Sequence, residues 1–359
     1  MGLLFLLGLA SLVGVLGMIL LPLYLLRRAP RRVRLSIVGP LAGLSVLLGV
    51  WIPSEILMRR AGYTPYARAF PGQFENAPKK LFWACADPTL GWTAFPSVRN
   101  TNPQGFRDRR DFDAVDHASS RTRVMVLGDS FVWGTSVNSN ETIPFLLERE
   151  LGDGFECFNL GMPGWGIDQM VLAHERFKDA IRPDVVILTF MDDDVLRVLE
   201  AYRWLQRMNK PSFEIRDGAL VPQDSPTGFE TFLNRIGTRS VSFGQLLCSV
   251  YVVTEARPVV DRLLADLAGE TVRMGGRLVV FRVPLPDEHT LAAALRRRMT
   301  SCRAAAEAAG ALYLDASEEL MRVPGWAEGF WADKHPSVRG NRLLVDFLRR
   351  HAFPDEVGR

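Results

Sequence analysis

Two long apolar stretches open the chain, and short apolar runs alternate with amphipathic segments through its second half. Residues 3–26 and 35–52 carry no charge. Each is long enough for a helix across a bilayer, which needs about 20 apolar residues. We therefore predict two transmembrane helices that form a membrane hairpin over residues 1–60. Because the first stretch ends in arginines rather than a small-residue cleavage site, an uncleaved helix is favoured over a signal peptide.

From residue 121 onward, strand-like apolar runs alternate with segments of helical spacing. The predicted strands are 123–129, 155–160, 184–190, 277–283 and 311–315, and the predicted helices are 143–151, 170–180, 259–274, 291–309 and 341–351. This alternation indicates an α/β fold with a parallel sheet covered by helices on both faces. In such sheets the functional crevice lies at the carboxyl ends of the strands.

The other segments are predicted to be connections. Residues 61–120 are rich in Pro, Arg, Asn and Asp, which predicts a linker that merges into an N-terminal cover of the main domain, residues 121–359. Gly, Pro and Ser punctuate residues 204–250. That punctuation predicts an irregular insertion within the main domain.

The distribution of charge indicates membrane topology rather than nucleic-acid binding. The net charge is +3, and residues 27–34 hold five arginines, so the rest of the chain carries a net charge of −2. A short basic loop stays cytoplasmic, which predicts that residues 54–359 are extracytoplasmic, in a periplasm or at the cell surface. A nucleic-acid partner is not expected. The run Arg296–Arg298 is interpreted as a solvated helix face.

Neither a metal nor a cofactor is expected. The four cysteines show no metal-binding spacing, and no His or Glu cluster accompanies the acidic triplet Asp192–Asp194. An extracytoplasmic location would permit disulfides, whose pairing the sequence does not define. Cys157 lies in a strand-like apolar run and is predicted to be buried.

A Gly-Asp-Ser sequence, Gly128–Ser130, follows the first predicted strand directly. Ser130 therefore falls at the carboxyl end of a strand and near the start of a helix. There its backbone N–H can point at a developing oxyanion. The alternative is that Asp129 and Ser130 only cap that helix.

An Asp-Lys-His sequence lies far along the chain, before the closing helix. Asp333 and His335 are two residues apart and Pro336 follows them. A serine nucleophile needs a neighbouring base, and the base needs a carboxylate that orients it. We predict that this loop folds back over Ser130. The alternative is a lone surface histidine beside a capping aspartate.

A glycine-rich segment, residues 159–169, follows the second predicted strand. Glycine lets the backbone approach a substrate closely and offers an unobstructed N–H. The alternative is an ordinary strand-to-helix turn. Trp133 and Trp165 lie next to the serine and glycine motifs, either as a platform for a sugar ring or acyl group or as core aromatics.

Together these segments resemble the SGNH/GDSL hydrolase family over residues 121–345. GDSF at 128–131, NLGMPG at 159–164 and DKHPS at 333–337 are similar to its first, second and last blocks, in the right order. The resemblance implies a flavodoxin-like, three-layer αβα SGNH-hydrolase domain with a parallel sheet. It also implies a serine that attacks an ester carbonyl.

The resemblance implies a role for each matched residue. Ser130 is the nucleophile, His335 the base and Asp333 its orienting carboxylate. Gly164 donates to the oxyanion. Asp129 is grouped with the oxyanion and substrate-binding residues, and the resemblance gives it no separate role.

Two departures from the family pattern matter. The third block should offer Gly-x-Asn-Asp, but this chain has FMDDDV, in which Asp193 best matches the asparagine and Asp192 is the alternative. Losing one oxyanion donor costs roughly 2.7–4 kcal/mol. Asp193 is then protonated beside its acidic neighbours, or rotated away, or the site is weak or non-catalytic. The smaller departure is that one residue, Lys334, separates Asp333 from His335, where many members have two.

These observations predict an extracytoplasmic serine esterase or deacylase that acts on O-acyl groups of a cell-surface glycan or lipid. The first alternative is an O-acyltransferase that modifies a cell-envelope polysaccharide. The second is a non-catalytic glycan-binding or assembly protein on the same fold. The expected partners are an ester or acylated glycan substrate, the membrane, and a membrane partner protein.

Overall fold

The computed structural model describes most of the chain after residue 50. The described residues are 51–66, 68–71 and 84–356, with Tyr24, Pro30, Arg32, Pro40, Gly43 and Gly49 before them. The predicted transmembrane stretches 3–26 and 35–52 lie largely outside the described residues. Within the described part, no helix has the length and apolar character needed to cross a membrane. The chain divides into two units, one of residues 69–226 and 251–359 and one of residues 1–68 and 227–250.

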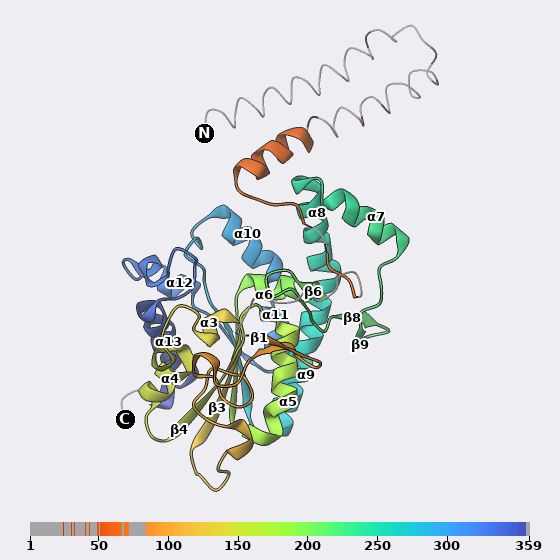
Figure 1. Ribbon diagram of the computed structural model, residues 1–359. Helices are drawn as coiled ribbons and strands as arrows, with labels where there is room; N and C mark the ends of the chain where they lie inside the picture. Colours follow the sequence, from red (N-terminus) through yellow and green to blue (C-terminus); the bar gives the residue numbers. More distant parts are fainter. Residues whose placement is uncertain are drawn as a thin grey trace. The chain divides into compact units, whose positions relative to one another are not determined.

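A five-stranded parallel sheet forms the centre of the larger unit (Figure 1). Its strands are β3 (Thr122–Gly128), β4 (Phe155–Gly161), β5 (Val185–Phe190), β10 (Arg277–Arg282) and β11 (Leu312–Asp315). They lie in the order β11-β10-β5-β3-β4, and every neighbouring pair is parallel. The predicted α/β fold with a parallel sheet is therefore confirmed. Beside β3 the order of strand addition switches, because β4 lies on one side of β3 and β5 on the other. Sheets of this kind bind ligands at such a switch point.

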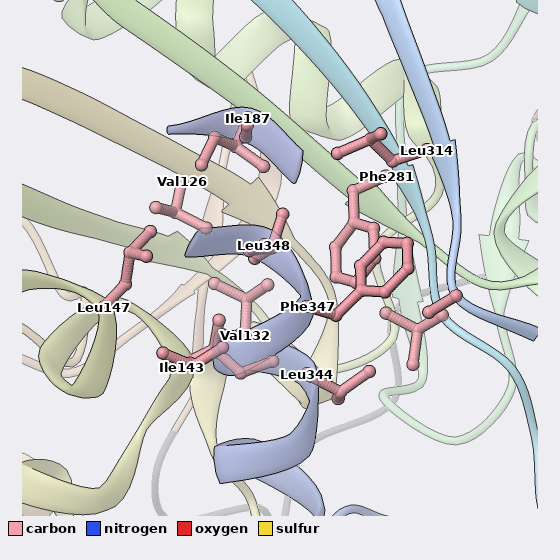
Figure 2. Packing of buried hydrophobic residues seen from close by; sticks show 14 of the residues in the cluster. Val126, Val132, Ile143, Leu147, Ile187, Phe281, Leu314, Leu344, Phe347 and Leu348 are labelled. Carbon is pink, nitrogen blue, oxygen red and sulfur yellow. The ribbon is translucent and has the colours of Figure 1, made fainter. Parts of the chain in front are cut away.

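Helices cover both faces of this sheet (Figure 1). Helices α4 (Ile143–Leu151) and α13 (Val338–Ala352) pack on one face, and α5 (Ile167–Ile181) and α9 (Arg257–Arg273) contact the strands from the other. Figure 2 shows the first interface, where Leu147 and Leu348 lie among side chains of the strands. Each such buried side chain contributes about 1.5–3 kcal/mol, so this core fixes the strand ends that carry the site.

The predicted helix 291–309 is wrong in one respect, because the structure divides it. Helix α10 (Leu291–Thr300) ends before Ser301, whose backbone is extended, and α11 (Arg303–Ala308) starts after Cys302. The buried hydroxyl of Thr300 donates to Asp192 Oδ1 at 3.0 Å. This long-range hydrogen bond fixes the end of α10, and helical periodicity alone does not reveal it.

The segment 204–250 is not irregular as predicted. Its elements, with the strand just before it, are β6 (Tyr202–Arg203), β7 (Met208–Asn209), β8 (Phe213–Arg216), β9 (Ala219–Pro222), α7 (Gly228–Gly237) and α8 (Val241–Tyr251). The strands are too short for a two-residue periodicity to be recognised. Asp217 and Gly218 do carry a signal, since both are left-handed and Asp-Gly is typical of tight hairpin turns.

The polar segment before residue 121 contributes to the core of the larger unit. Strands β1 (Ala84–Asp87) and β2 (Gly91–Ala94) form a hairpin. Trp92, Phe106 and Phe112 have no exposed surface. The ring of Phe106 packs edge-on against that of Trp165, with their centroids 5.8 Å apart. This segment is therefore part of the folded unit that carries the site.

In the smaller unit, a helix over residues 51–60 is joined to α8 by one carboxylate. Glu55 accepts hydrogen bonds from the backbone N–H groups of Val241 and Ser242, both at 2.9 Å. Trp51 Nε1 donates to the hydroxyl of Ser240 at 2.9 Å. Glu55 therefore caps the N-terminus of α8 across a long stretch of sequence.

All four cysteines are free thiols. Cys157 is buried as predicted, with 2% of its surface exposed. Its burial raises the pKa of the thiol well above the ordinary value, with a further contribution from nearby Glu148. The thiol of Cys157 is therefore a core group and a poor nucleophile.

Candidate active site

Ser130 lies at the carboxyl edge of the sheet, directly after β3. It begins the short helix α3 (Ser130–Trp133), which Asp129 caps by accepting the N–H of Phe131 at 2.9 Å. The capping interpretation is thus correct for Asp129. Gly161 at the end of β4 allows the close approach of α3, since a Cβ there would lie 2.3 Å from the backbone nitrogen of Trp133. The helix thereby holds the Ser130 hydroxyl at the strand ends.

The structure brings Ser130 and His335 together, although they are 205 residues apart. Ser130 Oγ and His335 Nε2 lie 3.0 Å apart, within hydrogen-bond reach. Asp333 Oδ2 lies 3.1 Å from Nδ1 of the same ring, although the angle departs from that of a hydrogen bond. The other oxygen, Oδ1, accepts the backbone N–H of His335 at 3.1 Å. The Ser130 hydroxyl, the His335 imidazole and the Asp333 carboxylate therefore lie next to one another in that order in space.

The conformation of Lys334 explains how one intervening residue suffices. Its φ of 69° is in the left-handed region, which turns the chain tightly between Asp333 and His335. Partial burial alone would raise the pKa of Asp333, but the hydrogen bond from the backbone N–H of His335 and the proximity of its ring hold that pKa below the ordinary value. The carboxylate is therefore ionised beside the imidazole at neutral pH.

A buried arginine lies behind the serine. Nη1 of Arg197 donates to Asp129 Oδ2 at 3.0 Å and to the carbonyl of Trp165 at 2.9 Å, and it also contacts Asp194. Complete burial, together with the charge of Asp129, raises the pKa of Asp194 well above its ordinary value. Arg197 thus joins the helix after β5 to the serine turn after β3.

The three consecutive aspartates have different surroundings. Asp192 receives two hydrogen bonds of 2.9 Å from Arg282, and Asp194 contacts Arg197. Asp193, between them in the first turn of α6 (Asp192–Arg197), is exposed. The carboxylates of Asp192 and Asp194 are thus bound by two different arginines and do not converge on one ion.

A cavity of about 440 Å³ lies beside Ser130. Its lining includes five of the six predicted site residues, Ser130, Gly164, Asp193, Asp333 and His335. The sixth, Asp129, is buried beneath it, with 2% of its surface exposed. Gly164 has a φ of +85°, which favours glycine, and a Cβ there would meet Nε2 of Gln206 at 2.4 Å. Gly164 therefore lies on the cavity wall in a conformation, and with a neighbour, that favour glycine.

Trp133, Trp165 and Arg296 differ in how they face the cavity. Trp165 has no exposed surface and belongs to the core. Trp133 is also buried, with 2% of its surface exposed, but it lines the cavity. Arg296 was predicted to be on a solvated helix face, which is wrong. It lines the cavity and donates to Asp192 at 3.3 Å, because α10 packs its basic face toward this buried carboxylate.

Arg107 and Asp108 form hydrogen bonds to the segments that carry the site, and the sequence analysis gave them no role. Arg107, in the NPQGFRD sequence, donates to the carbonyl of Val137 at 2.8 Å and contacts that of Gly134, after α3. Asp108 accepts the N–H of Asn159 at 2.8 Å. One sequence signal for them is the dense polar and glycine content of residues 102–108.

The serine, histidine and aspartate at the edge of a parallel αβα sheet define a site suited to ester cleavage. A sequence model of the GDSL-like lipase/acylhydrolase family matches residues 126–343. The protein belongs to this family, as the sequence blocks predicted.

Several solved structures are similar to this chain. A crystal structure of TesA is 14% identical, covers 65% of this chain and 99% of its own, and has a TM-score of 0.42. A member of the lipolytic protein G-D-S-L family from Veillonella parvula DSM 2008 is 14% identical, with coverages of 64% and 96% and a TM-score of 0.38. A catalytic mutant of Axe2, an acetylxylan esterase from Geobacillus stearothermophilus, is 16% identical, with coverages of 66% and 95% and a TM-score of 0.41. No curated protein matches the chain.

Proposed function

We propose that the protein is an extracytoplasmic serine esterase or deacylase that cleaves O-acyl esters of a cell-surface glycan or lipid. The observation that carries this proposal is the 3.0 Å separation between Ser130 Oγ and His335 Nε2. A serine within hydrogen-bond reach of a carboxylate-oriented histidine is the arrangement that activates an alcohol for attack on a carbonyl.

The reaction proceeds in two halves. Ser130 Oγ attacks the ester carbonyl while Nε2 of His335 takes the hydroxyl proton. The tetrahedral intermediate then releases the alcohol, which takes that proton from His335 and leaves an acyl group on Ser130. Water attacks this acyl-enzyme with His335 again as the base, and the acid leaves. Asp333 orients the ring and stabilises its cationic form.

The oxyanion is held by backbone N–H groups in this proposal. The donors are the N–H of Ser130, at the start of α3, and the N–H of Gly164, on the cavity wall. Asp193 lines the same cavity, where the family pattern has an asparagine. A carboxylate cannot replace the amide donor, so we expect a slower enzyme rather than an inactive one.

The direct test is labelling by a fluorophosphonate, which reacts with activated serines. We expect the wild-type protein to be labelled and the Ser130→Ala variant not to be, while His335→Ala reacts far more slowly. Equal labelling of wild type and Ser130→Ala, or none of either, would instead favour a non-catalytic binding or assembly protein.

The fate of the acyl group separates hydrolysis from transfer. Purified protein is incubated with an acyl-ester donor and a polysaccharide, and both free acid and acylated glycan are measured. Free acid alone supports the esterase. Acylated glycan that requires Ser130 would assign the protein as an O-acyltransferase.

We also propose that residues 3–26 and 35–52 anchor the protein, with the catalytic unit outside the cytoplasm. The support is the absence of charge in both stretches and the five arginines between them. Alkaline phosphatase fused after Arg359 should be active, since it folds only outside the cytoplasm. A fluorescent GFP fusion at the same point would contradict this orientation.

A further inference from the structure

We propose that the β6–β7 hairpin selects the acyl group of the substrate, and that Leu205 at its tip binds an apolar acyl chain longer than acetyl. This inference rests on the proposed esterase function. It concerns the four residues 204–207, which join β6 to β7 and belong to none of the family blocks.

Leu205 is an unusual residue for the wall of a cavity. It lines the same cavity as Ser130 and Gly164, yet 74% of its surface is exposed. Its neighbour Trp204 packs edge-on against Tyr202, with ring centroids 5.1 Å apart. Leu205 therefore presents apolar surface to water at the cavity wall, and an apolar chain that covers this surface gains the free energy of its burial.

Apolar side chains from other elements line the same cavity. Phe131 follows the nucleophile, Met191 follows β5, and Leu285 follows β10. Each is less than a tenth exposed and belongs to the core, so these three walls are preformed. The cavity of about 440 Å³ is of the size that holds small organic ligands, which is more than an acetyl group fills.

The hairpin is fixed directly beside the proposed oxyanion donor. Gln206 Nε2 donates to the carbonyl of Pro163 at 3.0 Å, and its side-chain amide covers the α-carbon of Gly164. Because Leu205 is adjacent to Gln206, it lies on the side of the cavity next to that donor. We therefore place the acyl chain of an ester whose carbonyl is bound by Ser130 and Gly164 beside Leu205.

The base of the hairpin is anchored as well. Lys210, which follows β7, forms an ion pair with Asp168, and both side chains are completely buried. The backbone N–H of Lys210 donates to the carbonyl of Ala201 at 2.9 Å, which closes the hairpin. A hairpin held at both base and tip can distinguish substrates by shape, since little ordering is required when the chain binds.

The test compares kcat/KM for p-nitrophenyl acetate and p-nitrophenyl octanoate in the full-length protein. We expect Leu205→Ser to lower the octanoate value by about tenfold or more and to leave the acetate value within about twofold. Val272→Ser is the matched control. Val272 is 64% exposed on α9 and does not line the cavity, so both values should be unchanged. Gln206→Ala should lower both values together, because it supports Gly164.

An octanoate-to-acetate ratio that Leu205→Ser leaves unchanged overturns the inference, even when both values fall. Loss of activity on an acetylated xylan with the ratio intact would assign Leu205 to a sugar ring and overturns it too. If wild type cleaves neither ester, the rates of inactivation by octyl and ethyl fluorophosphonates replace the kcat/KM values, and their ratio is compared between wild type and Leu205→Ser in the same way. No reaction with either probe removes the proposed function along with the inference, whereas a Ser130-dependent reaction with no chain-length effect removes only the inference.

Discussion

Oδ2 of Asp129 lies 3.0 Å from Nη1 of Arg197 and 3.2 Å from the hydroxyl oxygen of Ser130. The serine hydroxyl therefore has two acceptors, this carboxylate and Nε2 of His335 at 3.0 Å. Arg197 compensates the charge of Asp129 in a site where the arginine is only 7% exposed. Because Arg197 already donates to this carboxylate, Asp129 should compete less strongly with His335 for the serine proton.

Replacing Arg197 by Met should lower kcat by about tenfold or more and also destabilise the fold. The variant leaves Asp129 and Asp194 buried without their cation, which typically costs about 3–5 kcal/mol. Arg197→Lys should recover part of both losses, because it keeps the charge but not the planar donor set. Thermal unfolding and esterase kinetics at pH 8 are measured together. Arg262→Met, on the exposed face of α9, is the control, and wild-type kcat in Arg197→Met would contradict the assignment.

Asp193→Asn should make the enzyme faster. The amide introduces the N–H donor that the family pattern has at this position and removes a negative charge from the cavity. Since one such donor is worth about 100–1000-fold in kcat, a gain of about tenfold or more is expected once imperfect positioning is allowed for.

Asp193→Ala separates the two contributions, because it removes the charge without adding a donor. Its kcat should lie between those of wild type and Asp193→Asn. If Asp193→Asn is slower than wild type, the carboxylate has a positive role, such as binding a hydroxyl of the substrate.

The parts of this site that could be predicted are those encoded by local sequence. Ser130 follows a buried strand of seven residues, and strand and motif are recognisable without knowledge of the rest of the chain. Asp333 and His335 were recognisable because their chemistry needs both residue types close together. The parallel order of the strands follows from their alternation with helices.

The parts that were missed depend on contacts distant in sequence. The role of Arg197 depends on Asp129, 68 residues earlier, and an arginine on a helix is usually solvent-exposed. Arg296 was misinterpreted because the spacing of α10 does not show that a buried Asp192 lies opposite its basic face. The β6–β7 hairpin has strands of two residues each, which are too short for any periodic pattern.

Replacing one partner of the buried ion pair between Lys210 and Asp168 should lower the free energy of unfolding far more than replacing both partners. Burial holds the pKa of Asp168 above its ordinary value, although the charge of Lys210 opposes that shift. Lys210→Met leaves this carboxyl group without a partner, so the free energy of unfolding should fall by about 3–5 kcal/mol. The double variant Lys210→Met with Asp168→Asn should recover much of that loss. Urea unfolding of both variants measures the difference, and equal losses would show that the pair is not coupled.

The folded protein should lose stability as the pH falls, and His174 should account for part of that loss. His174 is 1% exposed in α5, and burial lowers the pKa of its ring to about 4 from an ordinary 6.5. Between these values the unfolded chain binds a proton that the folded chain does not. The free energy of unfolding therefore decreases as the pH falls from 6.5 to 4, by up to about 3 kcal/mol from this residue.

His174→Gln should flatten the curve of unfolding free energy against pH, measured by urea unfolding between pH 4 and 8. The same substitution at the exposed His117 is the control, and a curve that His174→Gln leaves as steep as that of wild type would contradict the prediction.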